Sequence, residues 1–323
     1  MKQVVLLVNL GSPENCDVKS IRQFLKEFLS DKRVVGLPKF LWYPILHGVI
    51  LPFRAKKLLH KYQQIWLNNG KSPLIHYTNC QTIALNKVLD GYDVYSCFSY
   101  GKQNIHNSLD VISKKYLGKY QLTILPLYPQ YSSSTTASVF DKVNDYFKQS
   151  YYIPQIQFIN SFASNNYYIN ALANKLKNHW DKFCKNKLVV SFHSVPQKMI
   201  DCGDAYQKEC EQTFQLLCNK LDIAERDAIL CYQSKFGNSK WIGPSTESVI
   251  KQLAKSGQKS IDVICPGFVS DCLETLEEIQ IQYTELFKAN GGKELKYIPC
   301  FNDDIEFINV LKNIITGESI CVE

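Results

Sequence analysis

The sequence predicts an α/β protein built from two doubly wound parallel sheets. Short apolar runs of strand length alternate with longer segments in which apolar residues recur at helical spacing. Most of the strand-like runs are mainly apolar, which is typical of strands that helices cover on both faces. The chain has 323 residues, of which 45% are hydrophobic and 21% charged, and this suits two folded domains of ordinary size.

Each element is predicted from its own pattern. The segment Val18–Leu29, for example, has Ile21, Phe24 and Leu25 on one face of a helix. The predicted strands are Lys2–Asn9, Asp93–Phe98, Gln121–Pro126, Gln155–Phe158, Lys187–Phe192, Ala228–Tyr232 and Ser260–Cys265. The clearest predicted helices are Val18–Leu29, Ser133–Lys148, Asn166–Phe183, Asp204–Leu221, Ser245–Lys255 and Thr275–Ala289.

A weak internal repeat supports two similar halves. Three positions recur at an offset of 140 residues: Pro126 with Pro266, Tyr128 with Phe268, and Thr135 with Thr275. The first copy is longer than the second, which indicates an insertion. We therefore expect a first half over 1–158 that includes an insertion over 33–57, a second half over 159–300, and a C-terminal segment over 301–323.

The insertion has an unusual composition. Residues Phe40–Phe53 read FLWYPILHGVILPF, which is strongly apolar but too short for a membrane span and contains Pro44 and Pro52. One interpretation is an ordinary buried loop and helix. The other is an apolar lip over a large hydrophobic ligand, which would also suit peripheral contact with a membrane surface.

Composition argues against several classes of protein. The net charge of +7 is spread along the chain and forms no dense basic stripe, so nucleic acid is not an expected partner. The twelve cysteines include no CxxC pair, and we interpret them as reduced thiols of a cytoplasmic protein. The N-terminus is predicted to be a core strand and not an export signal. No GxGxxG or P-loop pattern occurs, which disfavours nucleotide enzymes.

Three polar segments follow predicted strands, where open parallel sheets bind ligands. They are SFHSVP with His193, YQSKFGNSKWIGPST with Trp241, and DCLETLEE with Glu274. A lone histidine is more often structural, although the strand-end position of His193 favours function. Asp271, Glu274, Glu278 and Glu285 would share one face of a helix, which a plain solvated acidic face or the helix dipole would also explain.

Together these motifs resemble those of the ferrochelatases. LVNLGSP, LSDKRVVGLP, LPLYPQYSSSTT, SFHSVP, YQSKFGNSKWIGPST and DCLETLEEI follow the family pattern in order, from about Val4 to Asn302. The resemblance implies a chelatase-like fold of two flavodoxin-like halves with a porphyrin cleft between them. It also implies an apolar lip from the first half and a C-terminal helix that packs back on that half.

The resemblance also implies residue roles. His193 matches the family's catalytic histidine, which would accept pyrrole protons, and Glu274 matches its essential glutamate; both would contact the metal. Glu278 and Asp271 would continue a carboxylate path for protons or iron. The residues expected to contact porphyrin are Leu10, Tyr100, Tyr128, Ser132 and Trp241.

Departures from the family pattern qualify these roles. Ser99 replaces an arginine that would bind a propionate, and Gln280 and Gln282 replace outer acidic residues. Cys272 stands where animal members have histidine.

The predicted substrates are protoporphyrin IX and ferrous iron. No prosthetic group is expected, and no iron–sulfur cluster, because Cys321 is the only cysteine near the end of the chain. A monomer is favoured, although the sequence carries no signal of oligomeric state. The alternatives are a coproporphyrin III ferrochelatase, a cobalt or nickel tetrapyrrole chelatase, and a non-catalytic tetrapyrrole carrier.

Overall fold

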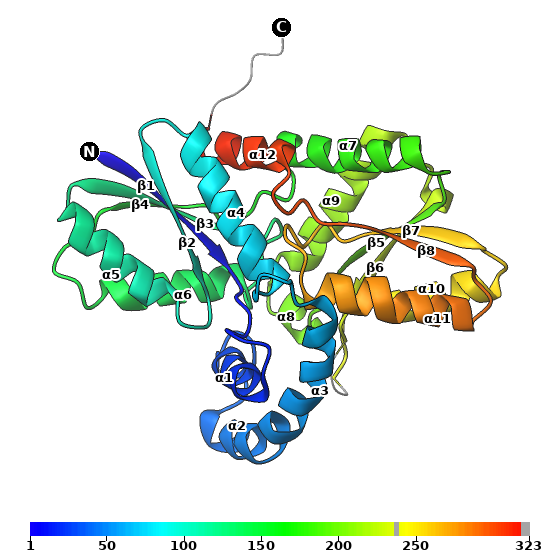
Figure 1. Ribbon diagram of the computed structural model, residues 1–323, viewed down its shortest axis with the longest axis horizontal. Coiled ribbons are helices and arrows are strands. Elements are labelled where there is room, and N and C mark those ends of the chain that lie inside the picture. Colours follow the sequence, from blue (N-terminus) through cyan, green and yellow to red (C-terminus); the bar gives the residue numbers. More distant parts are fainter. Residues whose placement is uncertain (236–238, 318–323) are drawn as a thin grey trace, which may run out of the picture. The chain divides into compact units, whose positions relative to one another are not determined.

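The computed structural model describes residues 1–235 and 239–317, and Figure 1 shows their helices and strands. These residues form two compact units, each with its own parallel sheet. Unit 1 comprises Met1–Tyr128, Ser132–Ser161 and the described residues from Leu311 onward; unit 2 comprises Pro129–Tyr131 and Phe162–Val310. The end of the predicted C-terminal segment, residues 318–323, lies outside the described residues.

The sheet of unit 1 has four parallel strands in the order β2-β1-β3-β4. The central strand β1 is buried from Val4 onward because strands flank it on both sides and helices cover both of its faces. In register, Val5 pairs with Val94 on one side and with Thr123 on the other. The strands are β1 Lys2–Asn9, β2 Tyr92–Phe98, β3 Tyr120–Pro126 and β4 Gln155–Phe158.

Helices cover this sheet on both faces. Ile105, Leu109 and Ile112 of α5 and Val139 and Val143 of α6 form one core with β1 and β3. On the other face, Asn86 of α4 holds β2 through two hydrogen bonds with the backbone of Val94. The helices are α1 Val18–Leu29, α2 Lys39–Ile45, η1 Leu46–Ile50, α3 Leu51–Ile65, α4 Pro73–Val88, α5 Ile105–Tyr116 and α6 Thr136–Phe147, where η1 is a π-helical turn.

Unit 2 repeats the same strand order, β6-β5-β7-β8, again fully parallel. Its strands occur along the chain in the same sequence of sheet positions as those of unit 1, so β5 corresponds to β1 and β7 to β3. The matched prolines of the sequence repeat, Pro126 and Pro266, close β3 and follow β7. The strands are β5 Lys187–His193, β6 Ala228–Gln233, β7 Ser260–Ile264 and β8 Glu294–Ile298.

The helices of unit 2 also form two layers. Val249 and Ile250 of α10, Ile279 of η3 and Phe287 of α11 share a core with the sheet, and α7 packs against α9 on the other face (Figure 1). The helices are α7 Asn166–Lys182, α8 Gln197–Asp201, α9 Tyr206–Leu221, η2 Glu225–Asp227, α10 Thr246–Lys255, η3 Leu273–Tyr283 and α11 Thr284–Ala289. Helix α12, Ile305–Thr316, begins in unit 2 and ends in unit 1.

The structure differs from the sequence prediction at two places. The strand β8 was not predicted, because Glu294–Ile298 is short and only Leu295 and Ile298 are buried. The predicted α-helix over Thr275–Ala289 is a π-helix, η3, followed by the short α-helix α11. A π-helix has i→i+5 hydrogen bonds and occurs frequently at functional sites.

Candidate functional site

The predicted site residues fall into two clusters, one at the carboxyl end of each sheet. His193, Trp241, Asp271, Glu274 and Glu278 belong to unit 2. Leu10, Tyr100, Tyr128 and Ser132 belong to unit 1. Each cluster is described by itself.

His193 is the last residue of β5, and its side chain is half-buried. The ring Nδ1 lies 2.6 Å from the backbone carbonyl oxygen of Ser194. A carbonyl oxygen only accepts hydrogen bonds, so Nδ1 carries the proton and the neutral ring keeps a lone pair on Nε2. The Phe268 ring lies beside the imidazole, with centroids 6.5 Å apart. The backbone thus holds His193 in the tautomer that acts as a base at Nε2.

Glu274 lies in the first turn of η3 and is half-buried. Its carboxylate lies beside the thiol of Cys272, the residue that caps η3. Burial and the neighbouring Glu274 charge raise the pKa of Cys272 well above its usual range, so the thiol stays neutral.

Glu278, one turn further along η3, is held at both carboxylate oxygens. The backbone N–H of Ser234 donates to Oε1 over 2.9 Å, and the Ser234 hydroxyl donates to Oε2. The Tyr283 hydroxyl also donates to Oε1, over 2.9 Å. Burial, then the charge of Glu278, raises the pKa of Tyr283, so this donor stays protonated. Glu278 therefore links η3 to the end of β6.

Asp271 is buried, with only 4% of its surface exposed, and is saturated with donors. Thr275, Tyr297 and the backbone of Cys300 donate to Oδ1 at 2.9, 2.6 and 3.4 Å, and Asn302 donates to Oδ2 at 2.7 Å. The backbone N–H of Asp271 donates to Asn302 as well, at 2.8 Å. These contacts tie the start of η3 to the segment after β8, so Asp271 holds the helix in place.

Trp241 lies in a loop that pairs with the segment after His193. It forms an antiparallel bridge with Pro196, and the N–H of Ile242 donates to the carbonyl of Val195 at 3.1 Å. The indole Nε1 is enclosed and has no hydrogen-bond partner among the described residues. Residues 236–238, which include Phe236 and Gly237 of the predicted loop, lie outside the described residues.

The unit 1 cluster begins at the end of β1. The N–H of Tyr100 donates to the carbonyl of Leu10 at 3.2 Å. Gly11 follows with a φ of +100°, and a Cβ there would lie 2.5 Å from the carbonyl oxygen of Tyr100, so only glycine fits. Leu10 and Tyr128 are half-buried, whereas Ser132 is buried and lies 3.1 Å from the hydroxyl of Ser134.

Tyr100 is enclosed within unit 1 and does not present an open ring face. It is 4% exposed, its edge packs on Phe28, and the Lys142 Nζ lies 4.0 Å from its ring centroid. Its hydroxyl donates to Asp31 at 2.8 Å. The resemblance makes Tyr100 a wall of the ligand site, and in this structure its ring is enclosed between Phe28 and Lys142.

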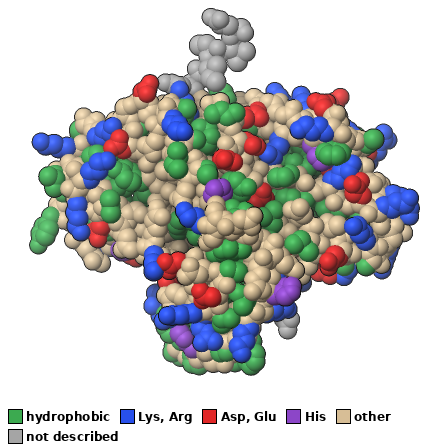
Figure 2. Space-filling model, viewed as in Figure 1, with side chains coloured by type: hydrophobic (Ala, Val, Ile, Leu, Met, Phe, Trp, Pro, Cys, Tyr) green, Lys and Arg blue, Asp and Glu red, His purple; other side chains and the backbone are tan. Residues whose placement is uncertain are grey.

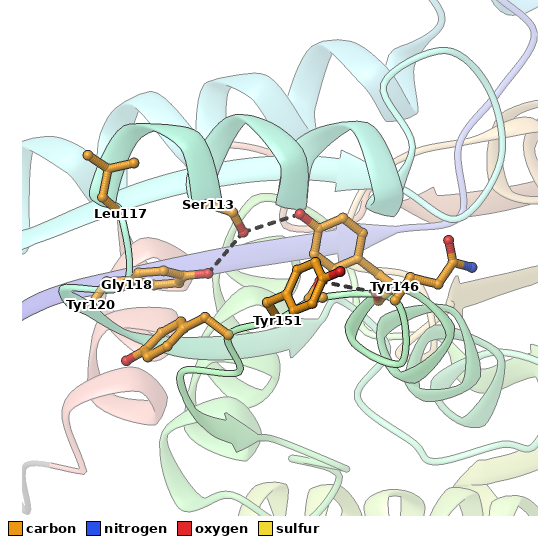
Figure 3. A pocket seen from close by; sticks show the side chains of 9 residues that line it. Ser113, Leu117, Gly118, Tyr120, Tyr146 and Tyr151 are labelled. Atoms are coloured by element: carbon orange, nitrogen blue, oxygen red, sulfur yellow. Dashed lines mark hydrogen bonds between the residues drawn. The ribbon is translucent and has the colours of Figure 1, made fainter.

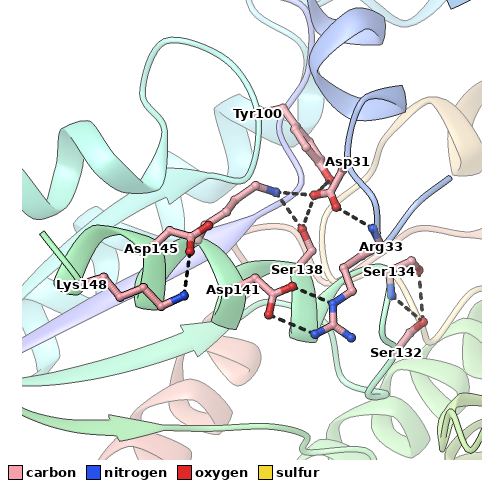
Figure 4. A network of polar contacts seen from close by, with 10 residues as sticks. Asp31, Arg33, Tyr100, Ser132, Ser134, Ser138, Asp141, Asp145 and Lys148 are labelled. Atoms are coloured by element: carbon pink, nitrogen blue, oxygen red, sulfur yellow. Dashed lines mark hydrogen bonds and ion pairs between the residues drawn. The ribbon is translucent and has the colours of Figure 1, made fainter. Parts of the chain in front are cut away.

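Asp31 is the centre of a polar network that sequence reasoning missed (Figure 4). The ammonium of Lys142 and the hydroxyl of Ser138 donate to Oδ2 at 2.8 and 2.6 Å, and the N–H of Arg33 donates to Oδ1 at 2.8 Å. Burial alone would raise the pKa of Asp31, but Lys142 and the other donors hold it below its usual range. Arg33 also forms a two-pronged ion pair with Asp141, at 2.7 and 3.0 Å. The network joins the base of the apolar insertion to α6.

The insertion itself presents a line of exposed apolar side chains. Leu41, Ile45, Val49 and Phe53 recur at every fourth residue and are 53%, 46%, 57% and 73% exposed. In an α-helix such a line drifts by about 40° per step, and the wider turn of η1 offsets part of this drift. The opposite side is buried: Trp42 donates to the carbonyl of Leu29 at 2.6 Å, and Leu46 is fully enclosed. Figure 2 shows hydrophobic side chains with nearby Lys and Arg at the position of α2.

Two cavities lie away from these clusters. One, of about 310 Å³, is at the start of β3 and is lined by residues that include Ser113, Tyr120, Tyr146 and Tyr151 (Figure 3). The other, of about 260 Å³, is lined in unit 2 by residues that include His179, Lys182 and Phe183. No predicted site residue lines either one.

The structure describes the possible metal ligands of residues 1–235 and 239–317. Within these ranges no three His, Cys, Asp or Glu side chains converge as metal ligands. None of the eleven cysteines there forms a disulfide, and Cys321 lies outside the described residues. In the same ranges, no helix is both long and apolar enough to cross a membrane.

Comparisons with known proteins agree with one another. The sequence model of the family described as Ferrochelatase matches residues 2–319. The chain is 42% identical over 313 residues to a protein named Ferrochelatase from Hamiltonella defensa, with 97% of each chain covered. It is 41% identical over 318 residues to a Ferrochelatase from Aliivibrio fischeri, with 98% of each covered.

Solved structures show a similar fold at much lower identity. SirB from Bacillus subtilis with Fe³⁺ matches with a TM-score of 0.59 at 12% identity, covering 98% of this chain and 97% of that one. The sirohydrochlorin chelatase SirB from Bacillus subtilis subspecies spizizenii, in complex with cobalt, matches with a TM-score of 0.56 at 13% identity and the same coverage. The predicted chelatase-like α/β fold is confirmed.

Proposed function

This chain belongs to the ferrochelatase family, and we propose that the porphyrin into which it inserts ferrous iron is protoporphyrin IX, with His193 as proton acceptor. In this reaction two pyrrole N–H bonds break, iron binds the four ring nitrogens, and two protons leave. Iron is a substrate here and not a resident cofactor. The observation that supports the role of His193 most strongly is its Nδ1 contact with the Ser194 carbonyl, which leaves Nε2 free as a base.

Glu274 is proposed to escort iron or to take the second proton. Its half-buried carboxylate lies in the first turn of η3 beside the neutral thiol of Cys272. Carboxylate oxygens are hard ligands that bind ferrous iron weakly enough to release it.

Glu278 and Asp271 are proposed to support this chemistry by fixing the position of η3, which carries Glu274. Glu278 keeps a negative charge one turn along η3, and its bonds to Ser234 and Tyr283 fix it there. Asp271 holds the start of η3 through its contacts with Thr275, Tyr297 and Asn302. In this scheme both residues set the position and potential of the Glu274 end of the path.

Protoporphyrin IX is favoured over coproporphyrin III because position 99 carries no positive charge. Coproporphyrin carries four propionates and protoporphyrin two, so the former needs more cationic partners. Ser99, where many relatives have arginine, is a buried neutral residue. Leu10, Tyr100, Tyr128, Ser132 and Trp241 are proposed to contact the macrocycle.

The exposed line Leu41, Ile45, Val49 and Phe53 supports a further proposal. With Lys39, Arg54 and Lys56 beside it in the sequence, it suits an apolar lip that touches an anionic membrane surface from the cytoplasmic side. A monomer remains the favoured assembly.

The test is a metallation assay with the purified protein. When the wild-type protein is mixed with ferrous iron and protoporphyrin IX, the absorption of the free-base porphyrin should fall and haem should form. His193→Ala should lower kcat by at least about a hundredfold. The matched control is His106→Ala, which removes an exposed histidine of α5 and should keep kcat within about twofold.

Parallel reactions separate the alternatives. A higher kcat/KM for coproporphyrin III would reverse the substrate assignment, and preference for cobalt or nickel would indicate a different chelatase. Porphyrin binding without insertion of iron or zinc would indicate a carrier and refute the role of His193.

A further inference from the structure

Gln233 connects the two residues of the proposed catalytic pair, His193 and Glu274. It is the last residue of β6 and pairs in register with His193, the last residue of β5. Only 1% of its surface is exposed, so it is enclosed by protein. Gln233 belongs to the polar segment at the end of β6, and the family resemblance implies no role for it.

Every polar group of the Gln233 side chain is used. Nε2 donates to the backbone carbonyl of Glu274 over 2.7 Å. Oε1 accepts from the hydroxyl of Ser191 at 2.7 Å and from the thiol of Cys265 at 3.5 Å. One buried amide therefore connects β5, β6 and β7 with the first turn of η3.

The backbone of Gln233 helps to orient His193, the other residue of the pair. Its carbonyl accepts from the N–H of Ser194 at 2.8 Å, and the carbonyl of Ser194 in turn orients the imidazole of His193. The next residue, Ser234, has a φ of +64° and directs both its N–H and its hydroxyl to Glu278. Gln233 and Ser234, consecutive residues at one strand end, thus hold Glu274 and Glu278 of η3.

We propose that Gln233 is a positioning residue that sets where Glu274 stands relative to His193. Its amide is the buried polar contact that joins the Glu274 backbone to β6. Without the donor at Nε2, the first turn of η3 loses this contact, and Glu274 no longer occupies one fixed position. This inference rests on the proposed roles of His193 and Glu274 and adds the residue that couples them.

The decisive variant is Gln233→Glu, which keeps the shape but makes the donor depend on pH. A neutral carboxyl group can donate its proton to the Glu274 carbonyl, whereas an ionised one faces that oxygen without a proton. Burial raises the pKa of an introduced carboxyl group. We expect kcat about tenfold or more below wild type at high pH, with the deficit shrinking as the pH falls and KM for porphyrin unchanged.

Two further variants complete the design. Gln233→Met removes the donor at every pH, so its deficit in kcat should be the same across the pH range. The control is Thr213→Val, which removes buried hydrogen bonds to Gln130 and to the backbone of Ala163 in the same unit, away from η3. Thr213→Val should lose stability while its kcat and its pH profile stay those of the wild type.

Hydrogen exchange of the backbone over 273–283 gives a readout that does not depend on activity. Faster exchange there in Gln233→Met, and a pH-reversible increase in Gln233→Glu, would support the inference together with the kcat profile. Unchanged hydrogen exchange, or a deficit in the kcat of Gln233→Glu that stays the same at every pH, would overturn the inference. An inactive wild-type protein would refute the proposed function, and the exchange arm would still decide whether Gln233 holds η3.

Discussion

The helix that follows the third strand occurs in both units, and the two copies differ in geometry and in the use of their polar residues. In unit 1 it is the regular α-helix α6, and in unit 2 it is the π-helix η3. At the repeat offset of 140 residues, Ser134 and Ser138 occupy the positions of Glu274 and Glu278. The two sheets have the same strand order, so the scaffold does not account for this difference.

The difference lies in where the polar groups are directed. Ser138 and Lys142 of α6 bind Asp31 and close a network inside unit 1. On η3, Glu278 is tied to Ser234, while the half-buried carboxylate of Glu274 lies beside the neutral thiol of Cys272. The same sheet topology therefore carries a structural helix, α6, in unit 1 and the helix with the proposed catalytic glutamate, η3, in unit 2.

The largest expected effect is on Glu274. Glu274→Gln keeps the shape of the side chain and removes its charge, so kcat should fall by about a hundredfold. Stability should change by less than about 1 kcal/mol, since the side chain is only half-buried. Steady-state kinetics alongside urea unfolding would separate the two effects, and a variant with wild-type kcat would remove Glu274 from the path.

Asp31→Asn should affect stability and not chemistry. It leaves Lys142 in a partly buried site without its counter-charge, at a cost of about 2 to 3 kcal/mol. The folded pKa of Asp31 is depressed, so its stabilisation is present above the unfolded value of about 4 and is lost as pH falls through the folded value. Urea unfolding at pH 7 and near pH 3 should show a wild-type advantage that shrinks in acid.

The matched pair Glu278→Gln and Ser138→Ala compares the two helices directly. Glu278→Gln replaces one acceptor oxygen with a donor that faces the donors of Ser234 and Tyr283, and kcat should fall about tenfold. Ser138→Ala should cost about 1 kcal/mol of stability and keep kcat within about twofold. If the two changes lowered kcat equally, the chemistry could not be assigned to η3 in preference to α6.

The smallest contrast concerns the matched threonines. The hydroxyl of Thr275 accepts from the N–H of Cys272 at 3.0 Å and donates to Asp271 at 2.9 Å, whereas Thr135 makes no side-chain capping bond. Thr275→Val should therefore cost about 1 to 2 kcal/mol and Thr135→Val less than about 0.5 kcal/mol. Thermal denaturation of both variants would show whether only η3 depends on this cap.

Much of the fold was predictable because its strands are buried on both faces. Val4–Val8 is a continuous apolar run, and Leu188–Phe192 is apolar except at Ser191; such runs indicate central strands. The π-helical geometry of η3 was not predictable, because the spacing of Ile279 and Tyr283 fits an α-helix equally well. The contacts at Gln233 and Ser234 that accompany this geometry come from a distant part of the chain.

The candidate site was predictable in part for a similar reason. His193 is the last residue of a buried strand, and Glu274 lies in the first turn of the helix that follows the neighbouring buried strand of that sheet, β7, where polar residues are conspicuous. Asp31 gave no such signal, since it follows an ordinary amphipathic helix and gains Lys142 and Tyr100 only on folding. Gln233 gave a faint signal as a polar residue at the end of a buried strand, but its partner carbonyl is invisible in sequence.

The π-helix also limits how the length of this segment can vary. Glu274 and Glu278 are both attached to the end of β6, and Tyr283 reaches back to Glu278 from within the same helix. Removing one residue from a helix rotates everything after it by about 100°. Surface loops of the chain can gain or lose residues, whereas a deletion within η3 would turn Tyr283 and α11 away from their partners. The number of residues in η3 is therefore as constrained as their identity.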